Sequence, residues 1–214
     1  MLKVWGRRSS ANVQKVMWLL GELDLPHQHI PAGGPHGGLN EPRFRAMNPN
    51  GLVPVIEDDG LILWESNAII RYLAARHGRG RLWEEDARAR APIDQWIDWA
   101  GTTFQPEMIG VFWSYWRTPE KERNADQIRN FEQRAERNLR ILDAVLATRA
   151  YIAGDKFTLA DIPSGVHLYR YFTMGTAVAK LPHLEAWYRR LAERSAYREH
   201  VMISYEELRG RLTF

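Results

Sequence analysis

The sequence contains no cysteine among its 214 residues. This absence excludes disulfide bonds, thiolate zinc sites, iron–sulfur clusters, a cysteine nucleophile and a redox CxxC motif. Any thiol in the chemistry of this protein must therefore belong to a bound molecule.

Long apolar stretches are absent as well. No run approaches the length of about 18 apolar residues that a membrane-spanning helix needs, and charged residues interrupt the first thirty positions, so no secretory signal is predicted. With 45% hydrophobic and 26% charged residues, the composition is that of a folded globular protein. We expect a cytoplasmic protein without a membrane partner.

Lysine is scarce: arginine supplies 24 of the 29 basic residues. The net charge of the chain at neutral pH is +3. The basic residues alternate with acidic ones, so the charge mildly favours anionic ligands but predicts no nucleic-acid interface. Motifs for phosphate-binding loops, serine hydrolases and zinc proteases are missing. His27 and His29 would share one face of a strand, but two histidines without a third ligand predict no metal site.

The first half of the chain alternates between strand and helix patterns. Residues 2–5 and 28–32 are short segments that predict strands, and between them apolar residues recur at helical spacing. Ser9 or Ser10 stands where this helix would begin, and serine is a common N-cap. The expected order is β-α-β.

Three further elements follow a glycine-rich loop. Pro42 opens a short helix, and residues 53–57 and 61–64 are apolar segments joined by Asp-Asp-Gly, a sequence typical of an antiparallel hairpin. Ser66 is then expected to cap a helix that ends at His77.

The second half has helical periodicity only. Long amphipathic segments begin after residue 84, and a short polar Gly-Arg-Gly-Arg segment precedes them. We therefore predict an α/β domain over residues 1–78 and an all-helical domain over residues 84–214. Within the second domain, Thr158 is expected to cap a helix, with Asp161 returning a hydrogen bond to its amide.

Polar residues at helix starts are the candidates for a binding site. Ser9, Ser10 and Asn12 follow the first strand, and Glu65 and Ser66 follow the hairpin. Unpaired backbone amides and the helix dipole favour anions at both places. Two such places in one small domain suit two anionic groups of a single elongated ligand.

Three motifs together resemble the glutathione S-transferase family over essentially the whole chain. Residues 48–58 (NPNGLVPVIED) are similar to the family's segment leading into a cis-proline, and residues 64–69 (WESNAI) to its glutamate–serine signature. Residues 154–161 (GDKFTLAD) are similar to the folding motif of its helical domain. The resemblance implies a thioredoxin-like first domain, an all-helical second domain, and glutathione as co-substrate with no metal.

The resemblance also implies how glutathione, an anionic tripeptide thiol, is held. Ser66 would bind the γ-glutamyl carboxylate and Glu65 the adjacent ammonium group. Val53, fixed by a cis bond to Pro54, would present its backbone to the cysteinyl group. Leu52 stands where related classes often carry Gln or Lys, and the candidates to compensate for that missing contact are His36, Asn40 and Asn50.

Catalysis by such a protein needs an ionised thiol. A free thiol has a pKa of about 8.5, and lowering it by about two units takes about 2.7 kcal/mol. One hydrogen bond to the thiolate and a helix N-terminus together supply that much. By resemblance to theta-like and phi-like members, Ser10 is the expected donor and Ser9 the alternative, whereas Asn12 is placed like the asparagine of nu-like members. Trp5 stands where other classes carry a catalytic tyrosine.

Large apolar residues are concentrated early in the helical half. Those that face the glutathione site would bind a planar hydrophobic electrophile, and the others would belong to the core. The candidates are Phe104, Met108, Phe112, Trp113 and Trp116.

These features predict a glutathione transferase that joins the thiolate of glutathione to small hydrophobic electrophiles, and the resemblance implies a homodimer. Two alternatives stay open. One is a glutathione-dependent disulfide-bond oxidoreductase or peroxidase, and the other is a non-catalytic ligand carrier or interaction module. Without cysteine, a mixed disulfide with the protein itself is excluded.

Overall fold

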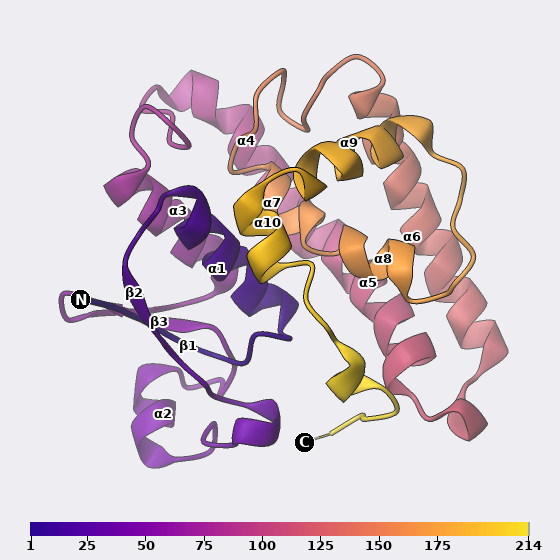
Figure 1. Ribbon diagram of the computed structural model, residues 1–214, viewed down its shortest axis with the longest axis horizontal. Coiled ribbons are helices and arrows are strands. Elements are labelled where there is room, and N and C mark those ends of the chain that lie inside the picture. The colour runs from indigo at the N-terminus through magenta and orange to yellow at the C-terminus, as the bar shows by residue number, and fades with distance from the viewer. Residues whose placement is uncertain (214) are drawn as a thin grey trace.

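Four short strands of the N-terminal half form one mixed sheet in the computed structural model, which describes residues 1–213. Across the sheet the order is β2-β1-β3-β4, with β1 parallel to β2 and antiparallel to β3 (Figure 1). The elements of this half are β1 (Leu2–Trp5), α1 (Ala11–Glu22), β2 (His27–Ile30), the 3-10 turn η1 (Gly34–His36), α2 (Pro42–Met47), β3 (Val55–Asp58), β4 (Leu61–Trp64) and α3 (Ser66–His77).

The two faces of this sheet are covered differently. Helices α1 and α3 pack on the face that joins the main core, whereas α2 lies on the opposite side (Figure 1). On that side, Phe44 of α2 forms a small separate core with Trp5 and Val55. Helix α1 is buried along most of its length because α10 covers the side that faces away from the sheet.

Proline determines where two strands depart from the prediction. β2 ends at Ile30 and β3 begins at Val55, so Pro31 and Pro54 both lie outside the ladder. A proline has no amide hydrogen to donate to a neighbouring strand, which explains the shorter strands. The predicted hairpin is confirmed: Asp59 and Gly60 form its two-residue turn, with φ values of 49° and 87°.

The start of α3 differs from the prediction by one residue. Ser66 is the first helical residue, and the cap position belongs to Glu65, whose φ of 69° lies in the left-handed region. The expectation that Ser66 caps this helix is therefore wrong. Its side chain is only 5% exposed and is directed into polar contacts with other elements.

The C-terminal half is all helical, which confirms the predicted fold class of a thioredoxin-like α/β unit followed by helices. Two π-helical turns, η2 and η3, flank α5. The elements are α4 (Ala87–Trp99), η2 (Ala100–Phe104), α5 (Gln105–Val111), η3 (Phe112–Arg117), the 3-10 turn η4 (Glu120–Glu122), α6 (Ala125–Leu146), α7 (Asp161–Gly165), α8 (Leu168–Thr173), α9 (Pro182–Ala192), α10 (Ser195–His200) and the 3-10 turn η5 (Glu206–Leu208). Over residues 1–213, no helix has both the length and the apolar character needed to cross a membrane.

The predicted hydrogen bond between Thr158 and Asp161 is present. The amide of Thr158 donates to Oδ2 of Asp161 at 2.8 Å. The expectation that Thr158 caps the helix is wrong, because α7 begins at Asp161 and its N-cap is Ala160. The other carboxylate oxygen accepts from the amide of Ile152 and from the indole Nε1 of Trp187, each at 3.1 Å. Asp161 therefore joins three segments of the helical half, which exceeds the local role expected from the sequence.

Candidate functional site

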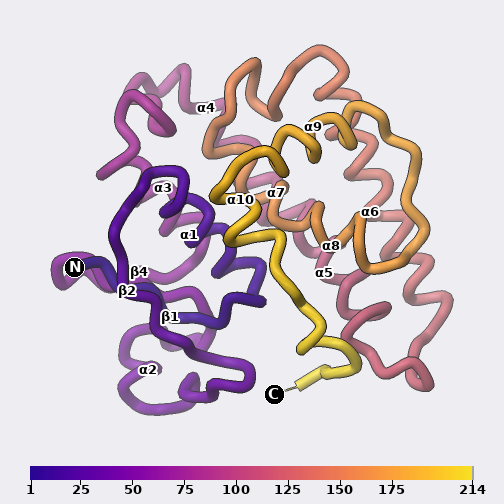
Figure 2. The backbone as a smooth tube through the Cα atoms, in the orientation of Figure 1, coloured from indigo at the N-terminus to yellow at the C-terminus, as the bar shows by residue number. Residues whose placement is uncertain are grey.

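A cavity of about 290 Å³ lies between the two halves of the chain, at the N-terminus of α1. The α/β half contributes Ser9, Ser10 and Asn12 from the start of α1 and Val53 from the segment before β3. The helical half contributes residues of α5, η3 and α8, and Leu208 comes from the C-terminal segment. This segment turns back from α10 towards the α/β half (Figure 2).

The side chain of Ser10 is not used to cap the helix. Ser10 occupies the N-cap position with extended backbone angles, yet its hydroxyl makes no capping hydrogen bond. The hydroxyl of Ser9 is buried and has no hydrogen-bond partner within residues 1–213, whereas its carbonyl accepts from Arg170 at 2.6 Å. Of the two serines, Ser10 is the more exposed to the cavity.

A buried lysine connects the two helix starts. Nζ of Lys15 donates to Oγ of Ser66 at 3.3 Å, to Oδ1 of Asn67 at 3.2 Å and to Oε1 of Gln105 at 2.5 Å. Ser66 in turn donates to Oδ1 of Asn12 at 3.3 Å. Through this network, the start of α1 is bonded to the start of α3.

Lys15 itself is only 1% exposed. Burial lowers the pKa of Lys15 to about 7, although the carboxylate of Glu65 opposes this shift. Sequence reasoning missed this residue. The available signal was its position as the one charged residue in the otherwise buried segment 13–20 of an amphipathic helix.

The structure places the other predicted glutathione contacts in different surroundings. Glu65 is exposed at the start of α3, and Val53 is half-buried and joined to Pro54 by a cis peptide bond, as expected. Asn50 is exposed, and its backbone and side-chain nitrogens both donate to Oδ1 of Asn48. The cavity brings Val53 together with Ser10 but does not include Asn50, Glu65 or Pro54 among its lining residues.

The predicted hydrophobic pocket is divided between cavity and core. Phe112 and Trp113 line the cavity. Phe104, which is fully buried, stacks on Trp99 with ring centroids 5.5 Å apart. Met108 and Trp116 are also buried in the main core, so the structure does not bring these three residues to the cavity.

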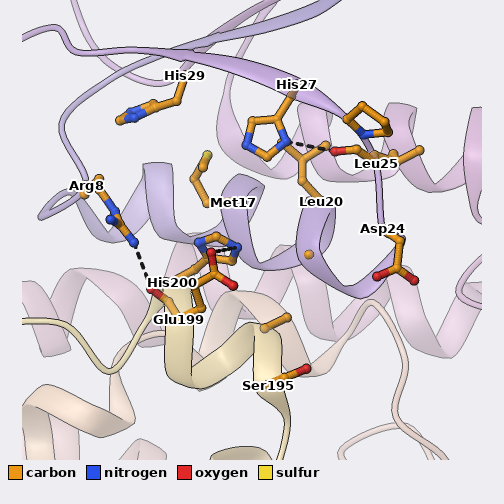
Figure 3. Close-up of a pocket in the computed structure, with 13 residues that line it drawn as sticks. Arg8, Met17, Leu20, Asp24, Leu25, His27, His29, Ser195, Glu199 and His200 are labelled. Carbon is orange, nitrogen blue, oxygen red and sulfur yellow. Dashed lines mark hydrogen bonds and ion pairs between the residues drawn. The ribbon is translucent and has the colours of Figure 1, made fainter.

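A second cavity, of about 570 Å³, contains the two histidines considered above. In Figure 3, His27 and His29 of β2 line one side of this cavity and His200 of α10 lines the other, and Arg8 donates to the carbonyl of Glu199. His27 and His29 each bond a backbone carbonyl through one ring nitrogen. No group of three or more His, Cys, Asp or Glu side chains in residues 1–213 is arranged to hold a metal ion.

Comparisons with known proteins agree with the geometry. The family description "Glutathione S-transferase, N-terminal domain" matches residues 5–81, and "Glutathione S-transferase, C-terminal domain" matches residues 104–195. The chain is 42% identical to glutathione S-transferase GstB of Escherichia coli K12, over 95% of this chain and 99% of that protein. It is 31% identical to glutathione S-transferase 3 of Zea mays, over 94% of this chain and 93% of that protein.

A solved structure gives the same result. The theta class glutathione S-transferase of Xanthomonas axonopodis pv. citri, crystallised with glutathione bound, superposes with a TM-score of 0.91. The identity is 42%, and the match covers 95% of this chain and 98% of the other. Both domains, their order and the full-length similarity lead to one conclusion: the chain belongs to the glutathione S-transferase family.

Proposed function

We propose that Ser10 stabilises the thiolate of glutathione in this glutathione transferase, and that the cavity beside Ser10 receives the electrophile. The observation that supports this most directly is the free hydroxyl at the N-cap of α1, placed in a cavity shared by Val53 and the aromatic side chains of η3. A serine hydroxyl has one hydrogen to donate, and no hydrogen bond of Ser10 to the backbone of α1 competes with a sulfur acceptor in the cavity.

Glutathione would lie along the two helix starts. The γ-glutamyl carboxylate would bind at Ser66, where the amides of α3 and the buried ammonium of Lys15 both favour an anion. Glu65 would hold the α-ammonium group, and the backbone of Val53 would pair with the cysteinyl residue. This arrangement directs the thiol towards Ser10.

The reaction then needs one ionised sulfur. The Ser10 hydroxyl donates a hydrogen bond to the thiolate, and the amides at the start of α1 add to its stabilisation. The thiolate forms a bond to the electrophilic carbon, and the leaving group departs with its bonding electron pair. The product is a thioether, and Phe112 and Trp113 would hold the apolar part of the electrophile.

Proton release on binding is the most direct test. Glutathione is titrated into the protein by calorimetry at neutral pH, in two buffers of different ionisation enthalpy, and the protons released per bound ligand are extracted. Release of a substantial fraction of a proton is expected. Binding of glutathione without proton release would contradict thiolate stabilisation and would favour the alternative of a disulfide-bond oxidoreductase or peroxidase. No binding of glutathione would favour the alternative of a non-catalytic interaction module.

Three further expectations from the sequence remain proposals. We place the domain boundary at residues 78–84, which is supported by the end of α3 at His77 and the start of α4 at Ala87. We also propose a homodimer and a cytoplasmic location. Analytical ultracentrifugation and cell fractionation test the last two.

A further inference from the structure

Gln105, the first residue of α5, reaches from the helical half of the chain into the polar network between α1 and α3. Its Oε1 accepts a hydrogen from Nζ of Lys15 at 2.5 Å, the shortest of the three hydrogen bonds that Nζ makes within residues 1–213. The other two go to Ser66 and Asn67, which both belong to α3. Of these three acceptors, Gln105 alone belongs to the helical half.

A π-helical turn places the Gln105 side chain. The turn η2 directly precedes Gln105, and its i→i+5 hydrogen bonds enclose one residue more than those of an α-helix. The residues after η2 are therefore rotated about the helix axis relative to a continuous α-helix. Asn138 of α6, which is 1% exposed, donates from Nδ2 to the carbonyl of Thr103 in this turn at 3.1 Å. The position of Gln105 is thus set by a packed helical turn.

The directions of the hydrogen bonds identify the state of Lys15 that Gln105 supports. The hydroxyl of Ser66 gives its one hydrogen to Asn12, so it can only accept from Lys15. The side-chain oxygens of Asn67 and Gln105 are acceptors as well. Three acceptors match the three hydrogens of an ammonium group, whereas a neutral amine would leave one acceptor opposite its lone pair.

Burial works against this protonated state. It lowers the pKa of Lys15 to about 7, and the carboxylate of Glu65 acts in the opposite direction. His167 is a second titratable group near Lys15, and burial, then Lys15 and Arg170, keep its pKa well below the ordinary value, so it adds no charge at neutral pH. A hydrogen bond to the charged form of a group favours that form, so Gln105 helps to keep the ammonium group available for an anion.

We infer that Gln105 is a positioning residue for glutathione: it holds the protonated side chain of Lys15 against Ser66, where the γ-glutamyl carboxylate binds. This inference rests on the proposed function, which places that carboxylate at Ser66. Gln105 acts through Lys15 and not through a contact of its own with glutathione. The helical half therefore contributes to the affinity for glutathione as well as to the electrophile pocket.

S-Methylglutathione measures this role without the reacting thiol. Its Kd is determined by calorimetry at pH 6.5 and at pH 8, on either side of the titration of Lys15. Gln105→Met removes the acceptor but keeps a side chain of similar length, and it should weaken binding by about tenfold at pH 8 and by less at pH 6.5. The two values differ because the variant favours the neutral amine, which is the competing form above the pKa of Lys15.

Gln105→Glu should give the opposite pH dependence. Its carboxylate would pair with Lys15, so the ammonium group stays protonated but is no longer available to the carboxylate of the ligand. We expect binding about tenfold weaker than in the native protein at pH 6.5, with little further change at pH 8, whereas the native affinity falls over this interval. A purely structural loss would weaken binding equally at both pH values in both variants, and that result overturns the inference.

Gln133→Met is the matched control, because Gln133 is exposed on α6 and its substitution should leave both affinities unaltered. Circular dichroism confirms that each variant is folded. In a Lys15→Met background, Gln105→Met should have no further effect, because Gln105 acts through Lys15. An additive effect of the two substitutions overturns the inference, as does a native affinity of Gln105→Met at pH 8.

The choice of ligand separates this inference from the proposed role of Ser10. S-Methylglutathione has no thiol hydrogen, so its binding does not depend on stabilisation of a thiolate. The expected pH pattern, in a protein whose bound glutathione keeps an ordinary thiol pKa, supports the inference and rejects the role of Ser10 alone. No binding of S-methylglutathione to the native protein overturns both.

Discussion

The buried ammonium group of Lys15 lies 3.3 Å from the hydroxyl oxygen of Ser66. Lys15 belongs to α1 and Ser66 to α3, so this contact joins the helix start proposed for sulfur with the one proposed for the γ-glutamyl carboxylate. The three hydrogen bonds of this buried lysine go to neutral oxygens, so when Lys15 is protonated its charge is offset only in part, by the nearby carboxylate of Glu65. A carboxylate at Ser66 would supply the missing negative charge.

We therefore predict that Lys15→Gln raises the KM for glutathione by about tenfold and changes kcat little, because a charge that acts on the bound carboxylate stabilises ground and transition states alike. Steady-state kinetics at pH 6.5 checks this. The exposed Lys156 supplies the control, since Lys156→Gln leaves the carboxylate site unaltered. An unchanged KM in Lys15→Gln would show that the carboxylate binds elsewhere.

The lowered pKa of Lys15 also predicts a pH dependence of stability. Between the folded-state pKa of about 7 and the ordinary value of about 10.4, the unfolded chain binds more protons than the folded chain. The free energy of unfolding should therefore rise with pH over this window. His167 adds little here, because burial, Lys15 and Arg170 lower its pKa well below the ordinary value.

Urea unfolding of the native protein and of Lys15→Met, measured from pH 7 to pH 9, isolates this contribution. Relative to the variant, the native protein should gain on the order of 2 kcal/mol across these two pH units. Parallel profiles of the two proteins would mean that Lys15 keeps an ordinary pKa in the folded state.

We expect different effects from substitutions of Ser10 and Asn12 at the start of α1. Ser10→Ala should lower kcat by about tenfold or more and raise the pKa of the thiol of bound glutathione, with little change in the affinity for glutathione. Ultraviolet absorbance of the thiolate as a function of pH measures this. Asn12→Ala should instead weaken glutathione binding, because Oδ1 of Asn12 accepts the hydrogen of Ser66. A raised thiol pKa in Asn12→Ala but not in Ser10→Ala would transfer the catalytic role to Asn12.

Substitution of two aromatic residues should distinguish a role in the core from a role in the cavity. Phe104 is fully buried, so Phe104→Ala should reduce the free energy of unfolding by about 3–5 kcal/mol. Trp113 is 40% exposed and lines the cavity, so Trp113→Ala should raise the KM for the electrophile with less than about 1 kcal/mol of lost stability. Chemical denaturation and kinetics on both variants check these values, and the opposite pattern would place Phe104 in the substrate pocket.

Asp161 should be sensitive even to an isosteric change. Burial raises the pKa of this carboxyl to about 6, although hydrogen bonds from Thr158, Ile152 and Trp187 oppose the shift. In Asp161→Asn an amide NH₂ replaces one acceptor oxygen and faces a donor, so we expect a loss of about 2 kcal/mol in unfolding free energy at pH 7.5. Thermal unfolding measures it, with the exposed Asp155→Asn as a control that should not change. Equal thermal stability of Asp161→Asn and Asp155→Asn would show that the hydrogen bonds of Asp161 do not stabilise the fold.

Local features of the sequence determined most of the fold. The Asp59-Gly60 turn, the helical period of α1 and the hydrogen bond from the Thr158 amide to Asp161 each depend on residues close together in the chain, where turn geometry and helix spacing act directly. The family motifs are local for the same reason. Pro31 and Pro54 also indicate from the sequence where β2 ends and where β3 begins, although the predicted strands included both prolines.

Only the tertiary structure decided which polar and aromatic groups meet at the cavity. Lys15 contacts Gln105 across 90 positions, and Arg170 bonds Ser9 across 161. Sequence periodicity assigns a residue to a helical face but not to the neighbour that covers that face, so it could not separate Phe104 in the core from Phe112 at the cavity. Burial by distant segments also sets the charge environment of Lys15 and Arg170, because desolvation depends on what packs around a group and not on its neighbours in sequence.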